Sequence, residues 1–247
     1  WPVHTARIMI DRPAREIVIE AASRLRVTRP LPEALVDDPT IAQAAEAARR
    51  VRSLAADAPA SYLFPSPLIP IDAEIASWCA QELAQGRGIV EAGLALSRRI
   101  KAEFRYDGAA TTAETTPREA FAGRHGVCQD FAQVMIAGAR GVGIPAAYVS
   151  GYLRTLPPPG RPRLVGADAT HAWVMLWCGP ARGWIGFDPT NGCAVGSDHI
   201  VTAFGRDYAD VTPIDGIFLG QDGQKIDVEV DVEPLDEAAA PPVALGA

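Results

Sequence analysis

Three residues with the chemistry of a thiol-dependent catalyst lie in the second half of the sequence. Cys128 opens an apolar helical pattern in GRHGVCQDFAQVMIAGARGVGIP (residues 123–145), His171 begins the apolar run HAWVMLW, and Asp188 ends the run GWIGFD. A free cysteine, with a pKa of about 8.5, is only a few per cent thiolate at neutral pH. A helix N-terminus and a neighbouring imidazolium both favour the thiolate, and an aspartate can orient the imidazole. This arrangement suits a thiol nucleophile with a base and a group that orients the base.

Each of these residue types also has an ordinary structural interpretation. An isolated cysteine is more often a packing residue, a histidine among apolar neighbours can belong to a core, and an aspartate before a proline is a natural turn residue. His125 lies three residues before Cys128 and is an alternative base. Asp130, in the first helical turn, can complement the helix dipole, although its charge opposes thiolate formation.

The first part of the sequence has strand-like and then helical periodicity. Alternating apolar and polar residues between positions 3 and 28 predict a β-hairpin. Asp38 and Pro39 predict the N-cap and first position of an Ala-rich helix over residues 39–55. The prolines of residues 59–70 then predict a linker without regular structure, and we place a domain boundary there.

Beyond the linker the periodicity becomes helical and later returns to strands. Four helices are predicted: one begins at Asp72 and ends near Gly86, one carries Ile89 to Phe104, one begins at the capping box of Thr116 and Glu119, and one follows Cys128. Three strands are predicted in AAYVSGYLR, THAWVMLW and GWIGFD, and the last two are joined by the tight turn GPARG. His171 and Asp188 should therefore lie on adjacent strands, and they can come within hydrogen-bond reach of each other if the strand register allows it. Alternating acids at residues 227–233 predict one more half-buried strand.

Composition narrows the classes of function. The 247 residues carry a net charge of -7, which argues against a nucleic-acid partner because such binding needs a basic surface. No apolar stretch reaches the roughly 18 residues that span a bilayer, so we expect no membrane partner. The four cysteines form no C-x-x-C pair and no zinc-ligand spacing, and we expect a reducing cytoplasm. Cys79 and Cys178 fit apolar core positions, and Cys193 has no predicted role.

The segments GVCQDFAQVMIAGARGVGIPAAYVSGYL, HAW and GWIGFDPTNG together resemble the transglutaminase-like superfamily, in particular its bacterial transglutaminase-like enzymes and cysteine proteases. The resemblance covers a core from about residue 68 to residue 196. It extends to DHIVTAFGRDYADVTPIDG, which includes His199 and is similar to the C-terminal part of these proteins. It implies that Cys128 is the nucleophile, that His171 is the base, and that Asp188 orients the base.

The resemblance and the motifs together predict an α+β fold with a papain-like, transglutaminase-like core, in which the catalytic helix packs on an antiparallel sheet. We place a small N-terminal β-rich domain at residues 1–65, the catalytic domain at 66–235, and a flexible tail at 236–247. Two features depart from the family's pattern. Met175 stands where many members carry an acidic residue. Compared with the family's N-terminal domain, we also expect the first strand or strands to be missing from the start of this sequence.

The expected chemistry is acyl transfer on an amide bond, through a thioester on Cys128 that water or an amine resolves. The backbone N–H of Cys128 and a donor from Tyr106 or Gln81 would hold the oxyanion. No dense acidic loop offers a regulatory calcium site, so hydrolysis is favoured over glutamine crosslinking. A non-catalytic binding module is a further alternative. We expect a peptide or protein substrate and neither metal nor organic cofactor; the sequence does not fix the oligomeric state.

Overall fold

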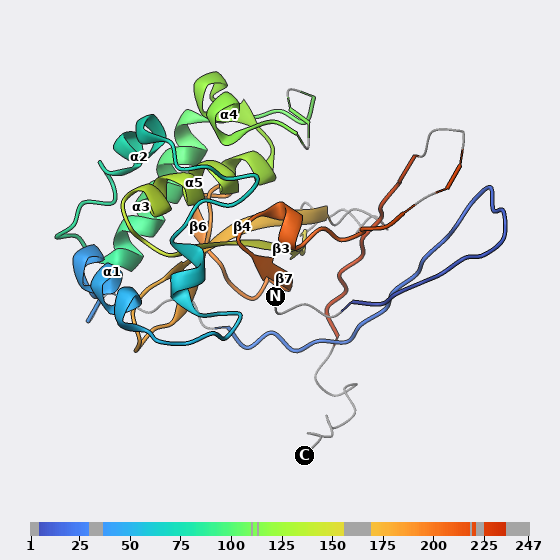
Figure 1. The fold of residues 1–247 in the computed structure, drawn as a ribbon, viewed down its shortest axis with the longest axis horizontal. Helices are drawn as coiled ribbons and strands as arrows, with labels where there is room; N and C mark the ends of the chain where they lie inside the picture. Colours follow the sequence, from blue (N-terminus) through green and yellow to red (C-terminus); the bar gives the residue numbers. More distant parts are fainter. Residues whose placement is uncertain are drawn as a thin grey trace, which may run out of the picture.

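A five-stranded antiparallel sheet forms the centre of the molecule in the computed structural model, which describes residues 5–29, 37–109, 111–112, 114–155, 169–217, 219–220 and 225–235. The order of its strands is β6-β5-β4-β3-β7. In chain order these strands are β3 (Ala146–Leu153), β4 (Ala169–Trp177), β5 (Trp184–Asp188), β6 (Cys193–Ala194) and β7 (His199–Gly205). The helices gather beside this sheet (Figure 1). The predicted α+β class, with a helix packed on an antiparallel sheet, is confirmed.

The helical layer consists of short elements with local capping signals. Its helices are α1 (Ile41–Arg50), the 3-10 helix η1 (Pro59–Tyr62), α2 (Ala73–Cys79), α3 (Ile89–Glu103), α4 (Pro117–Gly123), α5 (Cys128–Gly141) and the 3-10 helix η2 (Tyr208–Asp210). Asp72 caps α2, and Thr116 forms the predicted capping box with Glu119. Helix α2 ends at Cys79, seven residues before the predicted end at Gly86. A two-residue parallel pair, β1 (Arg105–Tyr106) with β2 (His125–Gly126), leads into α5.

Helix α5 is the buried axis of the helical layer. Its side chains from Asp130 to Arg140 are all buried, and its apolar residues join the main core with side chains of β3 and β4. At Gly138, a Cβ atom would lie 2.1 Å from Cys79 Sγ, so only glycine allows α2 to approach this closely. Neighbouring elements therefore pack against α5 along most of its length and hold the start of the helix, where Cys128 lies, in place.

The helix predicted at residues 39–55 is shorter than expected, and its cap is different. Thr40 is the N-cap of α1 and forms a capping box with Gln43. Asp38 instead accepts hydrogen bonds from the backbone N–H groups of Val90 and Glu91 at 3.1 Å and so caps α3. The N-cap residue of α3, Gly88, has no side chain, which leaves this position to an aspartate from a distant part of the sequence.

The segment predicted as a linker packs against the body of the protein. Tyr62 and Ile69 are fully buried, and Ile41 of α1 shares one hydrophobic cluster with Ile69 and the core of the helical layer. The predicted boundary between residues 65 and 66 therefore lies beside side chains that pack in a common core. It stays a prediction for the chain that precedes α1.

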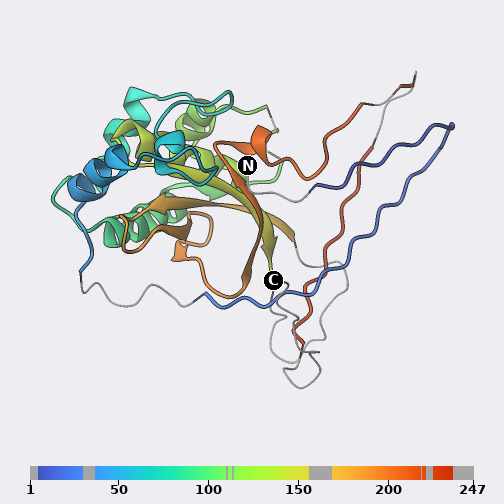
Figure 2. The ribbon, with the colours of Figure 1, turned by 60° about the horizontal axis from the view of Figure 1, so that its bottom comes forward.

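Residues 5–29 are extended and largely exposed, and the structure gives them no β-strand. They leave the body as a long ribbon that turns back on itself (Figure 2). Residues 225–235 are also extended, and Val230 alone among them forms a β-bridge. The N-terminal β-rich domain and the C-terminal strand thus stay predictions. The predicted tail at residues 236–247 lies outside the described residues.

Candidate active site

Cys128 is the first residue of α5, as the sequence predicts, and its side chain is half-buried. The Asp130 carboxylate reaches back over this helix start and accepts hydrogen bonds from Val127 N–H at 2.8 Å and from Thr111 Oγ1 at 2.7 Å. Asp130 therefore serves the helix terminus, the structural role considered for it. The remaining N–H groups and the positive end of the helix dipole lie at the thiol.

His171 and Asp188 lie on adjacent strands and contact each other. Strand β4 pairs with β5 in antiparallel register, with Val174 opposite Phe187. This register brings His171 Nε2 to 2.8 Å from Asp188 Oδ2. The Asp188 side chain is fully buried and that of His171 is nearly so. The expected hydrogen bond between the two side chains is confirmed.

Burial and hydrogen bonding act in opposite directions on this pair. Burial lowers the pKa of His171, but the hydrogen bond to Asp188 and the influence of the Cys128 side chain, together with the charges of both groups, outweigh burial and raise the pKa to about 9. Burial raises the pKa of Asp188, but its hydrogen bonds to His171 and His199 hold it well below its usual range. The imidazole therefore favours its charged form between a carboxylate and a thiol.

A second histidine, to which sequence reasoning assigned no role, contacts the same carboxylate. His199 is the first residue of β7, and its Nε2 lies 3.0 Å from Asp188 Oδ2. The available signal was its position at the head of the apolar run HIVTAF, eleven residues after Asp188. This spacing does not indicate which strand pairs with the strand that carries His199.

The two histidines and Asp188 are residue types that bind transition metals, and their ligand atoms lie within 4.8 Å of one another. However, the Nε2 atoms of His171 and His199 both point at Asp188 Oδ2, at 2.8 and 3.0 Å. The carboxylate oxygen thus occupies the point at which a shared metal ion would have to lie. We interpret the cluster as two N–H donors on one carboxylate.

The alternative base lies elsewhere. His125 is on β2, where it pairs with Arg105, and its ring packs so closely over Gly123 that a Cβ there would lie 2.7 Å from Nε2. The imidazole whose pKa the Cys128 side chain raises belongs to His171.

The two candidate oxyanion donors differ in their relation to the thiol. Burial, together with the charges of Cys128 and Asp130, raises the pKa of Tyr106. Gln81 is exposed on the turn after α2. The assignment of either residue as an oxyanion donor stays a prediction.

The remaining cysteines are packing residues or lie at the edge of the sheet. Cys79 and Cys178 are fully buried, which confirms their predicted core positions. Cys193 is partly exposed on β6, where it pairs with Asp188.

Within the described ranges, no helix has both the length and the apolar character needed to cross a membrane.

Comparison with known proteins places this site in a family. A sequence model of the transglutaminase-like superfamily matches residues 77–189, a range that includes Cys128, His171 and Asp188. An uncharacterized protein of Mycobacterium tuberculosis is 39% identical over 231 residues, covering 92% of this chain and 73% of the relative. A protein-glutamine gamma-glutamyltransferase of Pseudomonas aeruginosa is 35% identical over 111 residues, covering 44% of this chain and 16% of that protein.

A solved structure has the same core architecture. The crystal structure of a proposed cysteine protease from Cytophaga hutchinsonii has 30% sequence identity and a TM-score of 0.51. The similarity covers 61% of this chain and 48% of that one, so it concerns about half of the solved chain. From the matched sequence, the near full-length relative and the shared fold, we conclude that the chain belongs to the transglutaminase-like superfamily.

Proposed function

We propose that this protein catalyses cysteine-dependent acyl transfer on amide bonds, with peptide or amide hydrolysis as its main reaction. Cys128 is the nucleophile, His171 the general acid and base, and Asp188 the group that orients His171. The observation that carries the proposal is the 2.8 Å hydrogen bond between His171 and Asp188, on an imidazole whose pKa the Cys128 side chain also raises. A Cys-His-Asp catalyst requires a base that an aspartate orients beside a thiol.

The chemistry follows from the protonation of the pair. The Cys128 thiolate attacks the amide carbonyl carbon, and the resulting oxyanion is held by the Cys128 N–H and by Tyr106. His171, as the imidazolium, gives its proton to the leaving nitrogen, and the C–N bond breaks to leave a thioester. The neutral imidazole then takes a proton from water, whose oxygen attacks the thioester. The acid is released, and the thiolate and imidazolium are restored.

Glutamine crosslinking is the second candidate because both reactions share the same thioester. Its support is the similarity to the Pseudomonas aeruginosa gamma-glutamyltransferase over 111 residues. In that reaction the acyl donor is a glutamine side chain, and a primary amine replaces water in the second half. The sequence contains no dense acidic loop of the kind that binds regulatory calcium, and this favours hydrolysis.

A peptide library assayed with wild type, Cys128→Ala and His171→Ala tests the proposal. We expect wild-type cleavage or deamidation and a loss of about 10³-fold or more in each variant, because the residues act as one unit. A glutamine peptide with excess primary amine, with and without calcium, separates the two candidates. Predominant amine incorporation would favour crosslinking. A protein that binds peptides but turns over none, with or without Cys128, would be a binding module.

A further inference from the structure

The carboxylate that holds His171 is also held by a second imidazole. His199 is 5% exposed, and its Nε2 lies 3.0 Å from the Asp188 oxygen that also binds His171. We propose, resting on the acyl-transfer function above, that His199 is a positioning residue. It fixes the Asp188 carboxylate in the one orientation that keeps His171 aligned with Cys128.

The other donors to Asp188 come from its own turn. Oδ1 accepts from the backbone N–H groups of Thr190 and Asn191 at 2.9 and 3.0 Å, and Oδ2 accepts from Asn191 Nδ2 at 2.7 Å. These three bonds let the carboxylate and the turn move as one body. His199 is different because it comes from β7, so its bond ties Oδ2 to another part of the sheet.

The order of the strands explains how the hydrogen bond between His199 and Asp188 can align His171. Strand β3 lies between β4 and β7, with Gly151 opposite His171 on one side and Leu153 opposite His199 on the other. Both imidazoles therefore lie on strands that pair with β3, one on each side of it. The Asp188 carboxylate lies at the end of β5, next to its own turn. Its hydrogen bond to His199 therefore fixes its position relative to β4, the strand that carries His171.

The His199 ring is itself held in place. The fully buried Trp173 ring packs edge-on against it, with centroids 5.3 Å apart and an interplanar angle of 78°. The His199 carbonyl accepts a hydrogen bond from Arg29 Nη1 at 3.1 Å. Because packing has already restricted this side chain, it loses little conformational entropy when it donates to Asp188.

The hydrogen-bond partners of the His199 ring indicate which of its nitrogens carries the proton donated to Asp188. Nε2 must carry a proton to donate to Asp188, and Nδ1 is buried with no hydrogen-bond partner among the described residues. A neutral ring protonated on Nε2 avoids a buried, unpaired N–H at Nδ1. It also avoids two imidazolium charges on one carboxylate. Nε2 of His199 thus serves as the donor to Asp188, and His171 is the imidazole that acts in the proposed reaction.

Three variants test the inference. His199→Leu removes the donor, His199→Gln keeps an amide N–H near the position of Nε2, and Thr202→Val is a matched control on the same strand. Thr202 donates to the Ser150 carbonyl at 2.9 Å, away from Asp188. We expect His199→Leu to lower kcat by about 10- to 100-fold with KM changed less than about twofold. The Gln and Val variants should stay close to wild type.

Alkylation of Cys128 by iodoacetamide at about pH 6.5 supplies a readout that needs no substrate. It separates failure of this inference from failure of the proposed function. An aligned His171 promotes the thiolate, so labelling should slow in His199→Leu and keep its wild-type rate in the other two variants. Far-UV circular dichroism confirms folding, and His199→Met is a second donor-free variant if the Leu variant does not fold. Wild-type labelling and kcat in a folded donor-free variant, or a Gln variant as impaired as Leu, would overturn the inference.

Discussion

At the scale of single residues, burial separates one thiol from the others. Burial raises the pKa of Cys79 to about 12 and raises that of Cys178 further, and both side chains are inaccessible. Burial also raises the pKa of Cys193. Among the four, Cys128 is the one whose side chain raises the pKa of an imidazole, that of His171. The chemistry proposed for this protein therefore belongs to one cysteine, selected by its surroundings.

The alkaline side of the pH profile should report His171. Since its pKa is raised to about 9, kcat/KM should fall as the pH rises through about 9, where the ring can no longer protonate the leaving nitrogen. In Asp188→Asn the hydrogen bond and charge that raise this pKa are lost or weakened, while burial, which lowers it, remains. The alkaline limb should then move to lower pH. Profiles of the wild type and the Asn variant measure this, and an unmoved limb would assign it to another group.

The same shift has a consequence for stability. A histidine whose folded-state pKa is raised from 6.5 to about 9 stabilises the fold fully below pH 6.5, and this contribution is lost as the pH rises toward 9. The opposite sign holds for Asp188. Its depressed pKa contributes stability above pH 3.8 that is lost as the pH falls below that value.

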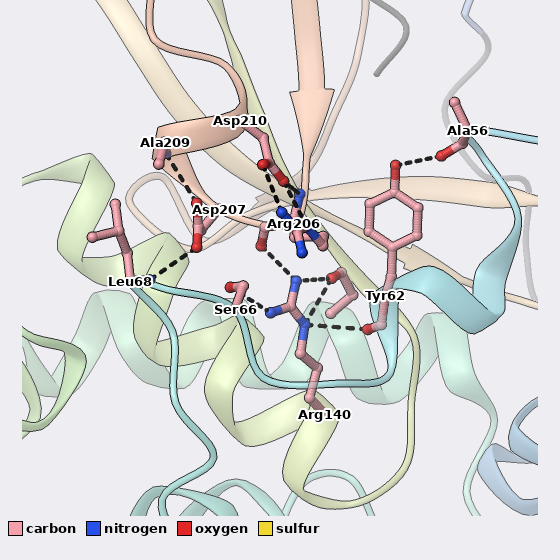
Figure 3. Close-up of polar contacts among 10 residues, drawn as sticks. Ala56, Tyr62, Ser66, Leu68, Arg140, Arg206, Asp207, Ala209 and Asp210 are labelled. Carbon is pink, nitrogen blue, oxygen red and sulfur yellow. Dashed lines mark hydrogen bonds and ion pairs between the residues drawn. The ribbon is translucent and has the colours of Figure 1, made fainter.

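At the scale of elements, one buried arginine joins the end of α5 to three other segments. Arg140 donates to the carbonyl of Tyr62 at the end of η1, to that of Ala146 at the start of β3, and to that of Arg206 after β7. It also donates to Ser66 Oγ at 3.2 Å. Figure 3 shows the guanidinium at the centre of these groups. Burial lowers the pKa of Arg140 to about 10, so the charge persists at neutral pH.

Arg140→Met should destabilise the protein by about 3 kcal/mol or more, because it removes a buried guanidinium together with the hydrogen bonds that it donates to several segments. Arg50→Ala is the control: Arg50 forms an exposed pair with Glu46 on α1, and its loss should cost about 0.5 kcal/mol or less. Urea unfolding followed by tryptophan fluorescence measures both. Equal effects of the two substitutions would show that the Arg140 contacts do not hold these segments together.

At the scale of the whole molecule, the body and the N-terminal ribbon differ in protection. Residues 41–50 and 59–155 contain helices and strands that share a core, whereas residues 5–29 are extended and exposed. Proteases need an accessible, extended chain, so exposed segments without hydrogen-bonded structure are cut first.

Brief trypsin digestion should therefore cleave after Arg15, Arg24 or Arg26 before any bond within residues 59–155 is cut. Intact-mass spectrometry of early time points identifies the fragments. Repeating the digestion in urea, where the body also opens, is the control. Early cleavage within the body, with residues 5–29 intact, would contradict this and would support a paired β-rich domain at the N-terminus.

Much of the fold could be predicted from the sequence because its signals are local. The caps of α2 and α4 depend on residues within three positions of each other, Asp72 with Ile75 and Thr116 with Glu119. The strands of the sheet follow from alternation and from tight turns. The contact between His171 and Asp188 follows from a hairpin whose two strands are joined by a short turn. Interactions over such short separations leave their pattern in the sequence itself.

The sequence by itself therefore predicted the helices and strands around the site, the position of Cys128 at a helix start and the contact between His171 and Asp188. Only the tertiary structure decided the rest. Asp38 caps α3 across a separation of 52 residues, and Arg140 reaches the end of β7 across 66. His199 reaches Asp188 because β7, the last strand among the described residues, pairs with β3 at the opposite edge of the sheet from β6. Such contacts depend on which strands become neighbours and in what register, which no short stretch of residues encodes.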